Sequence, residues 1–275
     1  MNTNAPTPGL WAFAVAACLT LALAARTAPA QLASPDPSTT TALDSPVNPE
    51  AVRTPSPPPM TKAGPDEKLA DAQAAVAARI AGVRTFKCDV EMRKRRDKPT
   101  HYGSIYKIKT GTLELTRGVG GRVVLTRKGE TEEYIANQRT IWSYEHKDKE
   151  AEFIPTSTPV ISTFVTEAMK LNVFFAADPD TIRLRGSQVI DGEDCWVMEG
   201  KTPARLKVVG LKQEKMTVWV AKGDGLPRRI HIPGNKFTVS MTNIRVNEDI
   251  DPARFEFSPP RGVATKNIFG FKSRS

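Results

Sequence analysis

From residue 86 onward, hydrophobic and polar residues alternate along most of the chain. Cys88, Val90 and Met92 are separated by charged residues, and the same spacing recurs further along. A period of two puts successive side chains on opposite faces of a β-strand. One apolar and one polar face are typical of antiparallel strands that cover a core on one side. Turn residues recur roughly every 10 positions, so the pattern predicts a meander of antiparallel strands.

A helix is expected before the strands, at residues 66–83. Asp66 follows a proline and is a suitable N-cap residue, and Gly82 is a typical helix terminator. Apolar residues at helical spacing form one narrow stripe. The stripe consists of Leu69, Ala72, Val76 and Ile80. An alanine-rich helix with a single apolar stripe is expected to pack on a sheet.

The alternation is interrupted at residues 157–172, where a second helix is expected. Thr158 is a suitable capping residue and Pro159 fits the first helical turn. The apolar side of this helix consists of Ile161, Phe164, Val165, Ala168 and Leu171. An apolar helix between two runs of strands is expected to cover the sheet, either as a fixed lid on the core or as a movable cover over a pocket.

A second run of strands is predicted between residues 182 and 246. Its last strand changes phase, because apolar residues up to Met241 share one parity and those from Ile244 onward share the other. A β-bulge near Thr242 and Asn243 brings both sets to one face and bends the strand. Such a bend favours a curled sheet.

The N-terminal residues are typical of an export signal. Residues 10–25 are apolar but shorter than the ~20 residues that a spanning helix needs. The segment Ala28-Pro29-Ala30 that follows suits signal peptidase, with cleavage after Ala30. No Lys or Arg precedes the apolar segment, so an uncleaved signal anchor is the alternative; residues 15–18 also resemble a lipobox.

The composition divides the chain into four segments. Residues 31–65 are rich in Pro, Ser, Thr and Ala, which cannot bury enough apolar surface to fold. We therefore expect a signal peptide at 1–30, a disordered linker at 31–65, one domain at 66–262 and a C-terminal tail at 263–275.

The charge of the chain is concentrated in the domain. The 275-residue chain has a net charge of +9, and residues 1–65 contribute none of it. A basic domain favours anionic partners such as lipid headgroups or acidic proteins, although scattered charges are also typical of a solvated sheet face. The dense cluster Arg93-Lys94-Arg95-Arg96 is interpreted as a solvated strand end, and no nucleic-acid partner is expected.

Two cysteines, Cys88 and Cys195, remain after cleavage at Ala30, both in apolar strand contexts. They permit one disulfide in an oxidising compartment, or two buried free thiols.

No pattern typical of a catalytic or metal site occurs in the sequence. His101, His146 and His231 lie far apart, and no paired Cys or His spacing suggests a metal. The glycine-rich segment 118–121 leads into a strand, whereas a phosphate-binding loop leads into a helix. We expect no enzymatic activity, no cofactor and no metal.

Four motifs carry a resemblance to a known family. They are Asp191-Gly192 leading into a strand with Trp196, the strand at 216–222 with the following segment 225–230, the closing Asp251-Pro252-x-x-Phe255-x-Phe257-x-Pro259, and the opening Thr85-Phe86-Lys87-Cys88. Together with the succession of helix, meander, helix and meander, they resemble the LolA/LolB superfamily of lipoprotein carriers, the opening motif being similar to that of planctomycete-type members. We interpret the closing motif as the last edge of the sheet.

The resemblance implies an α+β fold, in which a curled antiparallel half-barrel sheet is covered by helices and encloses a hydrophobic cavity. It implies a periplasmic carrier that binds acyl chains of lipoproteins or lipids for transfer toward the outer membrane. Its partners would be those acyl chains and lipoprotein-sorting proteins of the inner and outer membranes. The alternative is a membrane-tethered sensor module of the same fold, which binds lipids or lipoproteins.

The residues expected to line the cavity and its lid come from strands and from the second helix. They are Trp142, Ile161, Phe164, Val165, Ala168, Leu171, Phe175, Met216, Val218 and Ile230. The family also uses an arginine to latch the lid, and four candidates remain open: Arg93, Arg95, Arg117 and Arg122. Adaptable methionines suit a cavity that must release its cargo. The candidates are Met169, Met198, Met216 and Met241.

Overall fold

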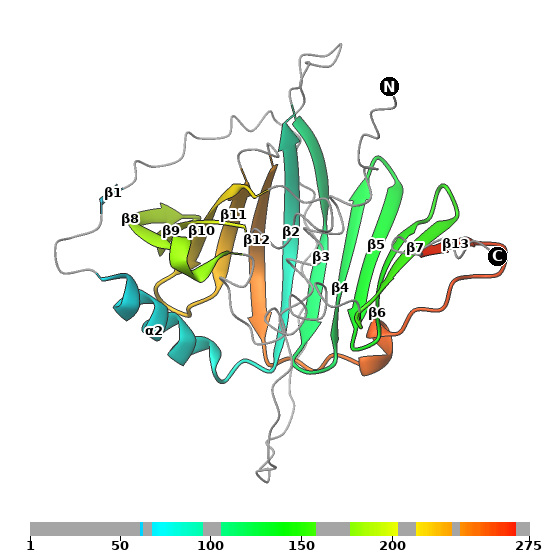
Figure 1. Cartoon of the computed structure of the whole chain (residues 1–275), viewed down its shortest axis with the longest axis horizontal. Coiled ribbons are helices and arrows are strands. Elements are labelled where there is room, and N and C mark those ends of the chain that lie inside the picture. Colours follow the sequence, from blue (N-terminus) through cyan, green and yellow to red (C-terminus); the bar gives the residue numbers. More distant parts are fainter. Residues whose placement is uncertain are drawn as a thin grey trace, which may run out of the picture.

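The computed structural model of the chain describes residues 61–62, 68–95, 106–157, 177–202, 213–232 and 237–267. These residues form one α-helix, two short 3-10 helices and thirteen strands (Figure 1). The helices are α2 (Leu69–Ile80), η1 (Pro179–Thr181) and η4 (Pro252–Phe255). The strands are β1 (Thr61–Lys62), β2 (Thr85–Arg95), β3 (Tyr106–Thr116), β4 (Gly120–Arg127), β5 (Glu130–Asn137), β6 (Thr140–Glu145), β7 (Glu150–Pro155), β8 (Arg183–Ile190), β9 (Glu193–Lys201), β10 (Lys215–Ala221), β11 (Pro227–Ile232), β12 (Phe237–Val246) and β13 (Ala264–Asn267).

All strands belong to a single curled sheet that does not close on itself. Their order is β1-β8-β9-β10-β11-β12-β2-β3-β4-β5-β6-β7-β13. The sheet therefore consists of two meanders, β2 to β7 and β8 to β12, joined where β12 pairs with β2. The curled antiparallel sheet is confirmed, with one exception: β13 pairs with β7 in the parallel direction.

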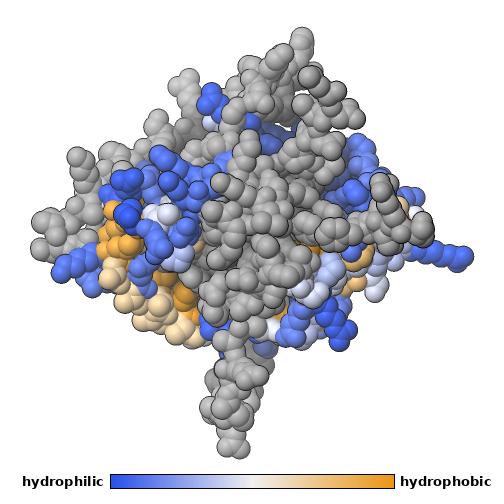
Figure 2. All heavy atoms as spheres, viewed as in Figure 1, coloured by the Kyte–Doolittle hydropathy of each residue, from blue (hydrophilic) through white to orange (hydrophobic). Residues whose placement is uncertain are grey.

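The first predicted helix is confirmed as α2, and its apolar stripe contacts the sheet. Ala72, Val76 and Ile80 are buried in the main core cluster, and Leu69 is partly buried against it. The helix ends at Ile80, two residues before the predicted glycine. Figures 1 and 2 show α2 beside the β8 to β10 end of the sheet, with hydrophobic residues gathered there.

The two faces of the sheet differ in composition. We call the face that carries the main core cluster the inner face and the opposite one the outer face. On β2, for example, Phe86, Cys88, Val90 and Met92 are buried, whereas the residues between them are partly exposed. The apolar residues of the predicted alternation therefore lie on the inner face, and the polar residues lie on the outer face.

The centre of the sheet contains a β-bulge and, on β3, a close approach of two backbones. The register between β12 and β2 shifts between Thr242 and Arg245, and Asn243 has a positive φ of 50°. This confirms the bulge expected from the phase change. On β3, a Cβ atom at Gly111 would lie 1.7 Å from the carbonyl oxygen of Val124, so the neighbouring backbone approaches a position that only glycine tolerates.

The closing motif does not form the last edge of the sheet, and this expectation was wrong. The Asp251 carboxylate accepts a hydrogen bond from the backbone N–H of Ala253, and Pro252 occupies the first turn of η4. The turn places Phe255, which is fully buried, against Gly120 of β4 on the outer face. The chain then reaches the far edge of the sheet, where β13 forms (Figure 1).

Other expectations fall wholly or mostly outside the described residues. The signal peptide, almost all of the linker and the second helix at 157–172 belong to this group, so the covering of the sheet by a second helix stays a prediction. Within the predicted linker, Thr61 and Lys62 pair as β1 with Ser187 and Gly186 of β8. None of the helices in the described ranges combines the length and the hydrophobicity that a membrane span requires.

Candidate functional site

The inner face carries rows of apolar side chains that run across the strands. One row is formed by residues that are successive partners on six adjacent strands. It consists of Leu184, Met198, Val218, Ile230, Val239 and Met92. A second row on the other half of the sheet consists of Leu115, Gly121, Ala136, Ile141 and Ile154. The inner face is therefore apolar on both sides of the β12–β2 pairing.

Three residues of the predicted site meet on this face. Met216 and Val218 on β10 are buried, and Ile230 on β11 is partly buried against the same core cluster. Val218 and Ile230 are direct cross-strand partners. The structure thus brings these three side chains together.

Trp142 does not join them. Its neighbour Ile141 belongs to the main core cluster, so Trp142 lies on the outer face. There its ring lies 4.8 Å from that of Phe153 and 5.2 Å from that of Phe257 in the closing motif. The remaining predicted site residues lie outside the described residues; they are Ile161, Phe164, Val165, Ala168, Leu171 and Phe175.

Methionines are prominent on the inner face. Met198, Met216 and Met241, which were singled out in the sequence, are each almost fully buried, and Met92 joins them. Met169 lies outside the described residues. Unbranched thioether side chains fill irregular spaces and adapt to different neighbours. The β9 to β2 part of the inner face is therefore suited to contact with ligands of variable shape.

Polar contacts fix α2 over the sheet. The Arg79 Nε donates a hydrogen bond of 3.0 Å to the carbonyl oxygen of Gly223, and its guanidinium lies 5.7 Å from the Trp196 ring centroid. At the other end, the Arg117 Nη2 donates to the carbonyl oxygen of Ile80 at 2.9 Å. Both contacts join the helix to turns or strands that are distant in sequence.

Among the four latch candidates, Arg117 contacts a helix. Burial lowers the pKa of its guanidinium from the ordinary value. Arg93 and Arg122 lie on the outer face, where each pairs with a glutamate of the sheet, and Arg95 is exposed at the end of β2. Among the four candidates, Arg117 thus joins the sheet to a helix. That helix is α2 and not the predicted lid at residues 157–172.

The outer face carries a buried carboxylate that anchors the C-terminal segment. Glu114 is buried and accepts contacts from the Arg254 Nε at 2.6 Å and the Lys87 Nζ at 3.2 Å. Burial alone would raise the pKa of Glu114, but the hydrogen bonds from Arg254 and Lys87 outweigh it and hold the pKa below the ordinary value. The ion cluster therefore ties the residue before Phe255 to β3.

A second buried ion cluster lies at the turn between β10 and β11. The Arg228 guanidinium is buried and contacts both carboxylate oxygens of Glu193, at 2.9 and 2.6 Å. It also donates to the Asp224 carboxylate at 2.6 Å. Since a buried guanidinium requires such partners, this cluster has a structural role in fixing the turn beside α2.

Both cysteines are buried and free. Burial raises the pKa of the Cys88 thiol and raises that of Cys195 to about 11. Of the histidines, His146 pairs with Glu133 and His231 contacts the Phe237 carbonyl and the Thr238 hydroxyl. In the described part of the chain, His, Cys, Asp and Glu side chains form no group of three that could hold a metal.

A cluster of cations at one end of the inner face was missed by the sequence interpretation. It consists of Lys94, Lys107, Lys109 and Arg127, on β2, β3 and β4. Lys94 and Lys107 are direct cross-strand partners. Because register rather than sequence distance brings these residues together, only an alternation count carried to the ends of all three strands would have indicated the cluster.

No protein-family model matches the chain, and no curated protein matches it. Solved structures that the chain is similar to include an uncharacterized conserved protein from Thermus thermophilus (10% identity, TM-score 0.45, 72% of this chain and 98% of the other covered). The lipoprotein LppX of Mycobacterium tuberculosis matches with 16% identity and a TM-score of 0.40, over 67% and 99% of the two chains. A LolA superfamily protein from Nitrosomonas europaea matches with 11% identity and a TM-score of 0.35, over 68% and 97%.

Proposed function

We propose that this chain is a periplasmic carrier that binds acyl chains of lipoproteins or lipids on its inner face, for transfer toward the outer membrane. The observation that carries the proposal is the continuous apolar inner face of a curled sheet whose edges do not close. Because the two edge strands, β1 and β13, do not pair with each other, a ligand can reach the inner face from an open side of the sheet. The resemblance in the sequence to the LolA/LolB superfamily supports the same function.

Apolar contact alone is sufficient for this kind of binding. Each methylene group transferred from water to an apolar face contributes about 0.8 kcal/mol, so a few acyl chains bind without polar recognition. Release requires that the face adapt as the ligand leaves. The buried methionines Met198, Met216 and Met241 favour such adaptation because their side chains change shape at low cost.

The predicted lid stays part of the proposal. We expect Ile161, Phe164, Val165, Ala168, Leu171 and Phe175 to contact the acyl chains from the side opposite the sheet. Within the sheet, Met216, Val218 and Ile230 are the proposed contacts. Trp142 packs on the outer face and serves as a reference position outside the binding face.

The N-terminal segment determines whether the protein is free in the periplasm or tethered to a membrane. A cleaved signal after Ala30 would give a soluble carrier, whereas an uncleaved apolar segment at 10–25 would tether a sensor module of the same fold. Fractionation of cells that express the full chain distinguishes them. A soluble form that begins at Gln31 supports the carrier, and a membrane-bound form that retains residue 10 supports the sensor. Crosslinking in the same cells would identify sorting proteins of either membrane.

Lipid binding is tested on the purified full chain. Mass spectrometry of the native protein is expected to find co-purified lipid, and acyl lipids are expected to displace an uncharged fluorescent probe such as N-phenyl-naphthylamine. If no lipid co-purifies and none displaces the probe, the proposal is wrong.

Two matched variants locate the binding face. Ile230→Thr on the inner face removes apolar contact, and we expect it to weaken displacement about fourfold, which corresponds to about one methylene group. Ile135→Thr introduces the same change on the outer face, where Ile135 is the partner of Trp142, and should leave lipid affinity unchanged. Equal effects of the two variants would contradict binding on the inner face.

A further inference from the structure

The cations at one end of the inner face stand directly in line with its apolar rows. The row that ends at Met92 continues to Lys109, its partner on β3. A neighbouring row runs from Ile232 on β11 to its partner Phe237 on β12, and from there to Lys94, the partner of Phe237 on β2. Lys94 in turn faces Lys107. Two apolar rows therefore both lead into lysines.

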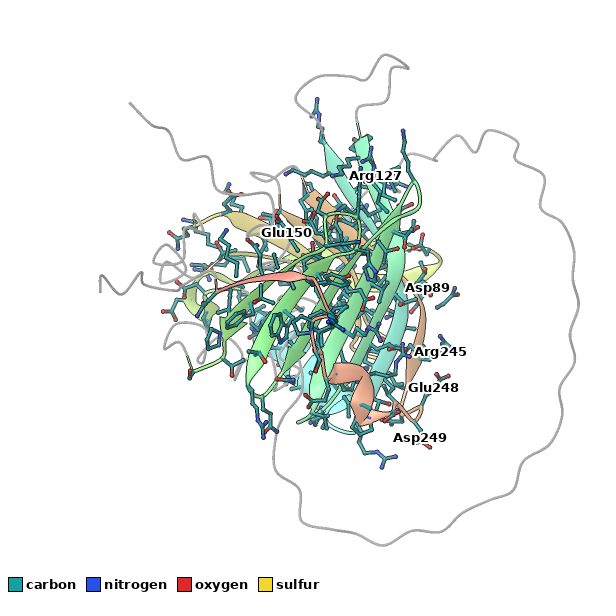
Figure 3. The ribbon with its side chains drawn as sticks, turned by 90° about the vertical axis from the view of Figure 1, so that its right-hand side faces the viewer. Asp89, Arg127, Glu150, Arg245, Glu248 and Asp249 are labelled. Atoms are coloured by element: carbon teal, nitrogen blue, oxygen red, sulfur yellow. The ribbon has the colours of Figure 1, made fainter. Side chains whose placement is uncertain are left out.

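A fourth cation completes the cluster. Arg127 is the last residue of β4 and shares the parity of Leu125, which is buried in the inner-face core. Figure 3 labels Arg127 near one end of the sheet, far from Glu248 and Asp249 at the other end. We call Lys94, Lys107, Lys109 and Arg127 the cationic rim.

The carboxylates nearby balance only part of the charge of the rim. Glu132 pairs with Lys109 and also accepts the Tyr134 hydroxyl. Glu130 forms an ion pair with Lys147 at 2.6 Å, and it is also the cross-strand partner of Arg127, whose charge acts on it. Among the described residues, Lys94, Lys107 and Arg127 have no carboxylate within ion-pair distance. Lys94 and Lys107, which face each other and not a carboxylate, are therefore the cations of the rim most available to an external anion.

This arrangement costs the protein stability. Like charges placed directly opposite each other on neighbouring strands repel, and Lys94 and Lys107 are such a pair. Burial lowers the pKa of Lys107, and the charges of Lys109, Arg127 and Lys94 lower it further, although Glu132 acts in the opposite direction. An anion bound among these residues would relieve the repulsion.

We propose that the cationic rim binds the anionic headgroup of a lipid whose acyl chains lie along the apolar rows of the inner face. The ligand class is thus an anionic amphiphile, such as a lipid with a phosphate or carboxylate headgroup. Lysine and arginine form short, charge-assisted hydrogen bonds with such groups. The six partner strands of the first row span about 24 Å at the usual strand spacing, which gives an extended acyl chain room beside the rim. This inference rests on the proposed function.

The test compares two lipids with identical acyl chains on the purified full chain at low salt. Phosphatidylglycerol carries an anionic headgroup, and diacylglycerol carries none. We expect phosphatidylglycerol to displace the uncharged probe at about tenfold lower concentration, as a charge-assisted hydrogen bond implies. In the double variant Lys94→Gln/Lys107→Gln, the two lipids should become equally potent, while diacylglycerol itself binds as before.

A matched control is present elsewhere in the same sheet. Lys201 and Lys215 are also direct cross-strand partners, but they are exposed and alternate with inner-face Gly200 and Met216, so they lie on the outer face. Lys201→Gln/Lys215→Gln removes the same charge and should preserve the preference for phosphatidylglycerol. Loss of the preference in this control would show a general effect of net charge and overturn the proposal.

The remaining outcomes separate the inference from the function on which it rests. If both lipids displace the probe equally in the unmodified protein, the rim does not bind the headgroup, while acyl binding stands. If neither lipid displaces it, both proposals fail. If inorganic phosphate raises the melting temperature of the protein as much as phosphatidylglycerol does, and the rim variant abolishes that effect, the anion is free phosphate and the lipid assignment is wrong.

Discussion

Replacing Phe255 with alanine removes the side chain that holds the C-terminal segment on the outer face. The ring is fully buried, and a Cβ atom at Gly120 would lie 2.8 Å from its Cβ, so it packs directly on the backbone of β4. The Asn137 Nδ2 still donates to the Phe255 carbonyl oxygen in the variant, so the segment cannot fully collapse into the space. We therefore expect the usual loss for a buried phenylalanine replaced by alanine, about 3–5 kcal/mol of unfolding free energy.

Urea unfolding followed by tryptophan fluorescence measures this loss. With a slope of about 2 kcal/mol per molar urea, the midpoint should fall by about 1.5–2.5 M. Phe257→Ala is the matched control, because Phe257 is only half-buried and its ring contacts those of Trp142 and Tyr144. It should cost about 1–2 kcal/mol. If Phe255→Ala costs less than Phe257→Ala, the anchoring role assigned to Phe255 is wrong.

Three further predictions concern other parts of the sheet. Gly111→Ala should lower the unfolding free energy by about 3 kcal/mol, because its Cβ would lie 1.7 Å from a backbone oxygen, whereas Gly82→Ala, with no atom within 4 Å, should change the melting temperature little. The ion cluster lowers the folded pKa of Glu114, so the ionised carboxylate stabilises the fold above its unfolded pKa of about 4.3, and this stability is lost as the pH falls through the folded pKa. Glu114→Gln should therefore flatten the dependence of the unfolding free energy on pH below about pH 5. An unchanged pH dependence would contradict the ion cluster. Cys88 and Cys195 should react with a thiol reagent at pH 8 at least about 200-fold more slowly in the folded protein than in urea, and rapid reaction of either would contradict their burial.

Features that depend on neighbouring residues were predictable from the sequence. The stripe of α2 follows from helical spacing, and the bulge at Thr242 follows from a change of parity within one strand. Both are fixed by a few consecutive residues, whatever packs against them. The inner-face positions of Met216 and Val218 follow from the same alternation.

Features that depend on distant partners were missed or misassigned. Phe255 and Phe257 alternate like strand residues, but the Asp251 cap and the following proline turn the backbone into η4. Trp142 has the size and polarity of an inner-face residue, and only its register with Ile135 places it on the outer face. The four exposed residues of β13 have no alternation of their own, because the edge of β7 supplies their pairing.

The same dependence on distant partners hid the cationic rim. Lys94 belongs to a basic run that is typical of a solvated strand end, and Lys107 lies thirteen residues further along the chain. Their opposition exists only when β2 and β3 pair in the observed register. Charge clusters of this kind are therefore found from the sheet and not from the composition.

The position of β2 beside β12 has a consequence for how the protein reaches its native state. Each meander is assembled from neighbouring strands, so its hairpins form within microseconds. The central pairing, in contrast, joins the first long strand to the last one, and closing such a distant contact is slow. A chain that emerges N-terminus first exposes the unpaired edge of β2 until β12 arrives, and open edges pair readily with the wrong strand. The pairing of β12 with β2 is thus central in the finished sheet, yet it is the strand pairing that leaves an edge open longest before it forms.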